Sequence, residues 1–238
     1  HAYINVLPGW KGTDEFKYNN NQLWTKNKDW FMVDVLGNTM LPTDGWYTFL
    51  NPAHPKVKHH IKGIVEEILE YDVDGLHLDY IRYPYDYFLV ANQIYTNSSR
   101  EKLRMVSNFS YDNISKLILK SNYGDDWTEN DVIDFRISMI TDLVGEISKK
   151  IKSRPNIILS ASILANPLDA RLYAGQDAPN WIHEKFMDYI FQMNYKSENF
   201  NENMKILSHE MGNNFFNNQA IVGIYPTDKK NEMIKKYL

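Results

Sequence analysis

Apolar and polar positions alternate along the chain in blocks that predict short strands separated by helices. Strands are predicted near residues 2–7, 74–79, 156–163, 188–193 and 220–224. Between them, apolar residues recur at three- and four-residue spacing, which is typical of helices with one buried face. These helices are predicted at 55–71, at 99–120, from Thr128 to Pro155, at 180–186, at 202–212 and from about 228 onwards. Strands and helices in alternation imply a parallel sheet, so the predicted fold class is α/β.

Two insertions follow predicted strands. Residues 9–30 are polar and are predicted to form a loop, and residues 30–36 and 45–50 are predicted to pair as a β-hairpin across the turn-rich segment 37–44. A second insertion, polar and aromatic, follows the strand at 74–79. Each insertion leaves the C-terminal end of a strand, which is the edge where barrels and open α/β sheets build their active sites.

The predicted strands carry polar side chains on one side only, because successive side chains point to opposite faces of a strand. The polar residues that share a face are His1, Tyr3 and Asn5; His77 and Asp79; Ser160 and Ser162; and Gln192 and Asn194. A sheet covered by helices on both faces is apolar on both. The one-sided pattern therefore favours a closed barrel whose interior opens into a polar pocket.

Composition narrows the function classes. The 238 residues suit one large α/β domain, with a net charge of −4 and no basic stripe, so nucleic acid is not an expected partner. No apolar run approaches the roughly 18 residues of a membrane span. Cysteine is absent, which excludes disulfides and thiolate metal sites. Aromatic residues make up 14% of the chain, and their ring faces can pack against sugars.

The segment 74–84, which reads Asp-Gly-Leu-His-Leu-Asp-Tyr-Ile-Arg-Tyr-Pro, resembles the signature of the bacterial glycosyl hydrolase-like family ten. Further matches follow in the same order along the chain: His1-Ala2-Tyr3-Ile4-Asn5, Leu50-Asn51-Pro52 with Pro55 and Val57, Phe135-Arg136, Gln176-Asp177 with Trp181, and residues 188–195. Three positions depart from the family pattern, with Tyr3 and Phe135 in place of tryptophan and Gln192 in place of proline.

The resemblance implies a (β/α)₈ TIM barrel that acts on carbohydrate. By its match to the family's third strand at His1, residues 1–238 are expected to be a partial catalytic domain, truncated at both ends, with about five parallel strands and a β-hairpin insertion after the first. Members of the family usually occur in exported or surface-attached bacterial proteins, so a secreted, periplasmic or cell-surface location is expected.

Glycoside hydrolysis needs two carboxyl groups that flank the scissile bond, one as proton donor and one as nucleophile or base. Asp79 is our candidate for one of them, because it ends a predicted strand on the polar side. The resemblance implies the nucleophile's role for it, as in amylase-like barrels. Arg82 and His77 are the candidate catalytic neighbours, since a nearby cation favours an ionised carboxylate. The alternative is a structural aspartate paired with Arg82.

The sequence does not identify the residue that supplies the second carboxylate. Its candidates all lie in predicted insertions or loops: Asp34, Asp44, Asp86, Asp177 and Glu198. Each is equally compatible with a solvated loop carboxylate, and the partner can also lie outside this chain.

Substrate-binding candidates that can hydrogen-bond sugar hydroxyls are His1, Asn5, Gln192, Asn194 and Tyr195, and Tyr83 in the 74–84 motif is a further candidate. The alternative is a polar network that holds the barrel interior together. Trp46 is a candidate sugar platform, as are Trp10 and Trp181, although core packing explains each of the three better.

Three function classes remain. The leading one is a glycoside hydrolase that acts on a bacterial or dietary poly- or oligosaccharide, with no cofactor and no metal, because no His, Asp and Glu set has metal-ligand spacing. The second is a barrel that binds glycan or peptidoglycan without cleaving it. The third is a metal-dependent lyase or deacetylase.

Overall fold

The computed structural model describes residues 1–11, 23–40, 47–84, 87–90, 93–96, 109–154, 156–195 and 199–224. Within these ranges one sheet has five strands: β1 (Ala2–Asn5), β4 (Gly75–Asp79), β7 (Ile158–Leu164), β8 (Tyr189–Met193) and β9 (Ala220–Val222). They lie side by side in chain order, and each pair of neighbours is parallel. A doubly wound sheet reverses its strand order at a switch point. The unreversed order is that of a (β/α) barrel, which confirms the predicted fold class and the five strands.

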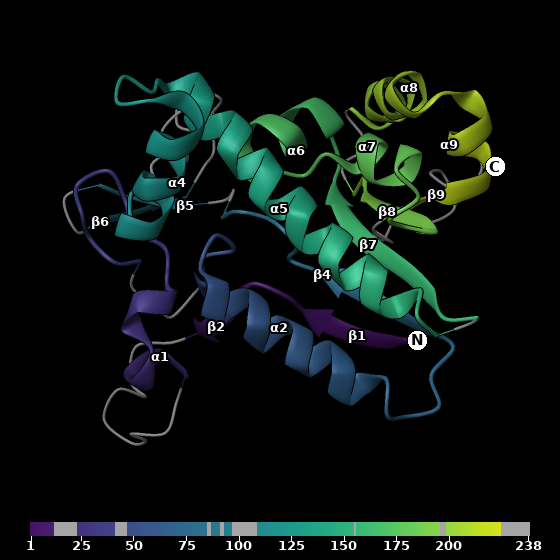
Figure 1. Ribbon diagram of the computed structural model, residues 1–238. Helices are drawn as coiled ribbons and strands as arrows, with labels where there is room; N and C mark the ends of the chain where they lie inside the picture. Colours follow the sequence, from purple (N-terminus) through teal and green to yellow (C-terminus); the bar gives the residue numbers. More distant parts are fainter. Residues whose placement is uncertain are drawn as a thin grey trace.

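Helices cover the apolar face of this sheet. Figure 1 shows α2 and α5 lying across β1, β4 and β7. The described helices are α1 (Leu23–Lys26), the 3₁₀ turn η2 (Lys28–Trp30), α2 (Pro55–Ile68), α4 (Asn113–Tyr123), α5 (Glu129–Ile151), α6 (Pro167–Ala174), α7 (Ala178–His183), α8 (Phe200–Met211) and α9 (Asn213–Gln219). One main core joins the sheet to these helices, and β4 contributes the fully buried Leu76 and Leu78 to it. The opposite side of the strands is left for polar side chains.

The two long helices begin as their sequences predict. Pro55 is the first residue of α2, where its missing N–H costs nothing, and His54 caps the helix by accepting from the Lys56 N–H at 3.1 Å. Thr128 and Asp131 form a complete capping box at the start of α5. Both helices therefore start at residues that satisfy their exposed N–H groups.

The predicted pairing of 30–36 with 45–50 is confirmed at one antiparallel bridge, between Phe31 and Leu50, but it does not extend into a hairpin within the described residues. The strand β3 (Tyr47–Phe49) pairs antiparallel with β2 (Pro8–Lys11), a segment predicted as loop. The segment after Trp30 makes only isolated bridges within the described residues. Phe31 is fully buried and its ring lies directly against Gly9, so the segment's apolar side chains serve the core instead of a sheet.

Three other parts of the described chain differ from the prediction. The helix predicted at 99–120 is α4, which begins only after Asp112, whose carboxylate accepts from the Ile114 and Ser115 N–H groups. The short helices α6 and α9 lie in predicted loops. In the second insertion, β5 (Tyr87–Val90) and β6 (Gln93–Thr96) form an antiparallel pair. The helix predicted from 228 lies outside the described residues.

Candidate active site

Asp79 is the last residue of β4 and lies at the C-terminal edge of the sheet. In the register between β1 and β4, Tyr3 stands beside His77 and Asn5 beside Asp79. The next residue, Tyr80, has a φ of 50°, a left-handed conformation that tyrosine rarely adopts. Such strain persists only where the surroundings enforce it, and it often marks functional sites. Here it turns the chain sharply out of the strand just after the carboxylate.

Each oxygen of the Asp79 carboxylate accepts a hydrogen bond. The Tyr3 hydroxyl donates to Oδ2, and the Tyr80 backbone N–H donates to Oδ1 at 2.7 Å. The carboxylate forms no ion pair with Arg82 among the described residues. The Arg82 guanidinium is buried, lies 5.0 Å from the centre of the Tyr80 ring and donates to the Tyr83 carbonyl oxygen at 3.4 Å. The structural Asp79–Arg82 pair is therefore not present, and Arg82 supports the turn instead.

The His77 ring is held by contacts from β1, β7 and β8. Its two ring nitrogens lie 2.9 and 2.8 Å from the hydroxyls of Ser160 and Ser162 on β7. Its ring stacks on Tyr3 with centroids 5.6 Å apart and meets the edge of Phe191 at 5.0 Å. Burial lowers the pKa of His77, and the charge of Asp79 only partly opposes this shift. His77 is therefore a neutral ring that braces the strands.

Tyr3 and Tyr195 flank Asp79 from strands that are not neighbours in the sheet. Tyr3 lies on β1 and Tyr195 follows β8, yet burial and then the charge of Asp79 raise the pKa of the Tyr195 hydroxyl, and Tyr195 also acts on Tyr3. Tyr3 stays 57% exposed and Tyr195 48% exposed, so both rings are open to a ligand.

Tyr195 and Asn5 remain candidates for binding substrate. Asn5 is exposed at the C-terminal end of β1, directly beside Asp79 in the register. Neighbouring parallel strands lie about 4.8 Å apart. A ligand that reaches Asp79 therefore also reaches the Asn5 amide.

Gln192 and Asn194 do not belong to this side, and the prediction that they face the polar interior is wrong. Both are fully buried towards the helices. The Gln192 amide donates to the carbonyl oxygens of Ala165 and Asn203, and the Asn194 amide donates to that of Phe200. These amides fix α8 to the sheet.

Two further candidates are placed away from the carboxylate. His1 lies over Gly75, whose added Cβ would stand 2.7 Å from the imidazole, at the N-terminal end of β4. At about 3.3 Å per residue this is roughly 13 Å from Asp79. Tyr83 is 2% exposed, and the Arg136 guanidinium lies 5.5 Å from the centre of its ring. Tyr83 therefore packs in the interior and cannot meet a sugar in this conformation.

The tryptophan candidates add no sugar platform within the described residues. Trp181 is fully buried and its indole N–H donates to the Thr141 hydroxyl at 3.1 Å, which makes it a core residue. Trp10 is partly buried against the main core. Trp46 lies outside the described residues.

The second carboxylate is not found among the described candidates. Both Asp34 oxygens are occupied by its own turn, through the N–H groups of Leu36 and Asn38 and the Asn38 amide. Asp177 pairs with Arg171 at 3.3 Å. Asp44, Asp86 and Glu198 lie outside the described residues. In the part of the chain that is described, Asp79 is the one carboxylate that acts on the pKa values of Tyr3, His77 and Tyr195.

No metal site or membrane span appears in the described ranges. Among those residues, no three His, Asp or Glu side chains come together as possible metal ligands. None of the described helices is long and apolar enough to cross a membrane. A hollow of about 470 Å³ lies between α5 and α7 and is lined by Glu146, Asn180 and Glu184 among others. It is formed by helices, away from the polar face that holds Asp79.

Comparison with known proteins agrees with this arrangement. A family model described as glycosyl hydrolase-like 10 matches residues 8–236. The chain belongs to the glycosyl hydrolase-like 10 family. It is 26% identical over 219 residues to glycosyl hydrolase YngK of Bacillus subtilis, which covers 84% of this chain and 36% of YngK. The chain thus spans about a third of the length of this curated relative.

Three solved structures are also similar to the chain. Aspergillus fumigatus Ega3 in complex with galactosamine has a TM-score of 0.38 at 14% identity, covering 95% of this chain and 61% of that one. A family GH13_31 enzyme has a TM-score of 0.44 at 11% identity, covering 89% and 40%. The trehalulose synthase MutB R284C mutant has a TM-score of 0.40 at 12% identity, covering 81% and 38%.

The Asp79 site contains residues that sequence reasoning did not assign to it. Tyr3, Ser160 and Ser162 were placed on the polar face but given no role, and Phe191 was placed on the opposite face. The signal for the first three was their alternation with apolar neighbours. The sequence pattern does not predict that Phe191 lies at this site, since the order of polar and apolar residues in β8 suggests the reverse orientation.

Proposed function

We propose that this chain carries the catalytic face of a glycoside hydrolase and that Asp79 is one of its two catalytic carboxylates. The observation that carries the proposal is the Asp79 carboxylate itself, held by two hydrogen-bond donors at the C-terminal edge of a barrel sheet. Membership of a glycosyl hydrolase-like family supports it. A poly- or oligosaccharide of bacterial or dietary origin is the proposed substrate.

In the proposed reaction Asp79 acts as nucleophile or base. A second carboxyl group then protonates the leaving oxygen. Asp44, Asp86 and Glu198 are the proposed sources of that group within this chain. The exposed rings of Tyr3 and Tyr195 supply aromatic faces for the sugar beside the carboxylate. We also propose that the protein works outside the cytoplasm, where such polysaccharides are met.

A glycan-binding barrel without hydrolysis is the second candidate. One observation favours it: among the described residues, Asp79 is the one carboxylate that acts on the pKa values of its titratable neighbours. A hydrolase needs two carboxyl groups at the scissile bond, whereas a binding site needs none in particular.

Asp79→Asn in the full-length protein separates the two candidates. Wild type and variant are assayed for reducing ends released from a panel of soluble glycans, and glycan binding is measured by calorimetry. We expect the variant to lose on the order of a thousandfold or more in turnover while it still binds, since the amide keeps the shape but not the charge.

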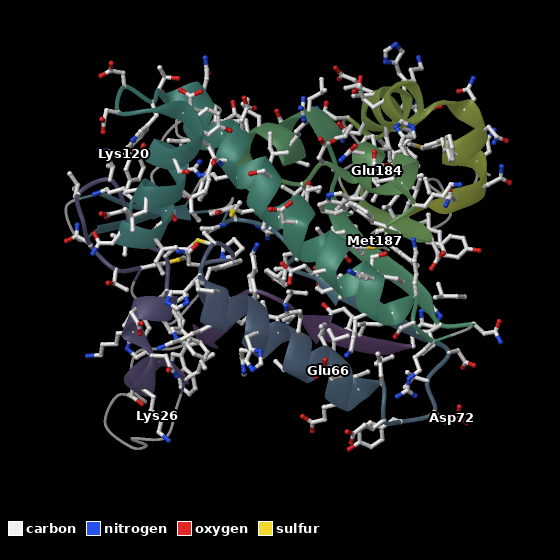
Figure 2. The ribbon with its side chains drawn as sticks, viewed as in Figure 1. Lys26, Glu66, Asp72, Lys120, Glu184 and Met187 are labelled. Atoms are coloured by element: carbon white, nitrogen blue, oxygen red, sulfur yellow. The ribbon has the colours of Figure 1, made fainter. Side chains whose placement is uncertain are left out.

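Asp72→Asn is the matched control, because Asp72 is exposed on the turn between α2 and β4 (Figure 2), at the far end of the strand. It should leave turnover unchanged. Binding without turnover by the wild type would favour the binding module. Full turnover by Asp79→Asn would remove Asp79 from the reaction.

A further inference from the structure

We infer that Tyr3 is the positioning residue of this site: its hydroxyl holds the Asp79 carboxylate in one orientation, and the His77 ring holds Tyr3. The inference rests on the proposed function for what Asp79 does, but the hydrogen bonds that carry it do not. The sequence pattern places Tyr3 on the polar face but assigns no role to it.

The contact between Tyr3 and Asp79 crosses from β1 to β4. Tyr3 stands beside His77 in the register, so its side chain leans along the strand towards the C-terminal edge to reach Asp79 two residues on. The Tyr80 N–H binds the other oxygen of the same carboxylate. With one donor on each oxygen, rotation of the carboxylate about its Cβ–Cγ bond breaks at least one hydrogen bond.

His77 keeps Tyr3 at this place. The two rings are nearly parallel, with an interplanar angle of 15°, and the His77 nitrogens are bound by Ser160 and Ser162 on β7. Phe191 on β8 closes the far edge of the imidazole. Tyr3 is 57% exposed and has little other support, so this stack fixes its ring. Contacts from β8 and β7 thus hold His77 on β4, His77 holds Tyr3, and Tyr3 binds the Asp79 carboxylate.

The titratable groups that face Asp79 are Tyr3 from β1, His77 from β4, Tyr80 and Tyr195. Burial raises the pKa values of Tyr3 and Tyr195 above the usual value for tyrosine, so both are neutral in acid and neutral solution. Burial lowers the pKa of His77. Tyr3, Tyr195 and His77 are therefore all uncharged at neutral pH.

The test is ¹³C NMR of aspartate-labelled full-length protein at pH 7, with Asp79→Asn identifying the signal of the Asp79 carboxyl carbon. We expect this signal to move in Tyr3→Phe, because the hydrogen-bond donor to Oδ2 is lost. His77→Asn should move the signal less, because it loosens Tyr3 without removing its hydroxyl. Tyr71→Phe, at an exposed position before β4, should leave the signal in place.

A kinetic measurement tests the same role in turnover. On the 4-nitrophenyl glycoside that the wild type cleaves fastest in a panel, Tyr3→Phe should lower kcat about ten- to a hundredfold and change KM little. An Asp79 carboxyl signal and a kcat equal to those of the wild type would overturn the inference. A moved carboxyl signal in a protein that cleaves no glycan would instead overturn the proposed function and leave the role of Tyr3 intact.

Discussion

At the scale of single residues, the site is a set of side chains that fix one carboxylate. Asp79 is bound by Tyr3 and the Tyr80 N–H, and Tyr3 rests on His77. His77 was predicted to be a catalytic neighbour of Asp79, but its nitrogens are occupied by Ser160 and Ser162. It acts on the carboxylate through Tyr3, not by exchanging a proton with it.

The lowered pKa of His77 predicts how stability depends on pH. A histidine is protonated near its ordinary pKa of about 6.5 in the unfolded chain, but resists protonation in the fold, so the unfolded state binds more protons. Its contribution to stability is therefore complete above about pH 6.5 and is lost as the pH falls from there towards the lowered value. His60, whose pKa burial also lowers, contributes with the same sign.

Urea unfolding at several pH values from about 7.5 down to 5 checks this prediction. The free energy of unfolding should fall with pH in the wild type and fall less steeply in His77→Asn, which removes one of the two groups. Equal slopes in the two proteins would mean that His77 titrates in the fold as it does in the unfolded chain.

Sequence alone placed Asp79, His77, Tyr3 and both serines on one polar face, because strands alternate strictly and these residues stand two apart. It placed Gln192 and Asn194 on the same face, which was wrong. Amide side chains can be buried when their hydrogen bonds are satisfied by backbone carbonyls. Those carbonyls belong to α8 and the segment after β7, so no local pattern reveals them.

At the scale of elements, the strands and long helices follow from periodicity, whereas the insertions do not. The predicted hairpin is reduced to the bridge between Phe31 and Leu50, and β3 pairs with β2, whose sequence Pro-Gly-Trp-Lys has no strand-like alternation. β2 pairs with β3 because Gly9 has no side chain, which leaves room for the buried ring of Phe31. The fit is tertiary, between residues far apart in the chain, and sequence patterns do not report it.

Two glycine substitutions test this fit. A Cβ at Gly9 would stand 2.4 Å from the Phe31 ring and 3.2 Å from Leu50, so Gly9→Ala should destabilise the fold by about 1–3 kcal/mol through overpacking. Gly63 is exposed within α2 with nothing within 4 Å of an added Cβ. Gly63→Ala should therefore stabilise by about 0.5–1 kcal/mol, since alanine is the better helix former.

Thermal unfolding of the two variants measures the difference. The melting temperature should fall in Gly9→Ala and rise slightly in Gly63→Ala. A Gly9→Ala protein as stable as the wild type would show that the β2 segment does not pack against Phe31 as described.

At the scale of the whole molecule, five parallel strands in chain order bring distant segments to one concave edge. Tyr3 and Tyr195 lie at opposite ends of the described chain, yet both stand within reach of the Asp79 charge. The fold class and the family could be predicted from the sequence, because the 74–84 motif is specific and strand spacing sets the topology. The second carboxylate could not, because loop carboxylates carry no periodicity that assigns them to a site.

The proposed function requires that the carboxylate of Asp79 takes part directly in cleaving a glycosidic bond. Turnover by Asp79→Ala in the full-length protein, measured with and without added sodium formate, tests it most directly, because formate supplies a small carboxylate to the space left by the side chain. We expect hydrolysis to be lost in the variant and to be partly restored by formate. Hydrolysis at the wild-type rate without formate would contradict it.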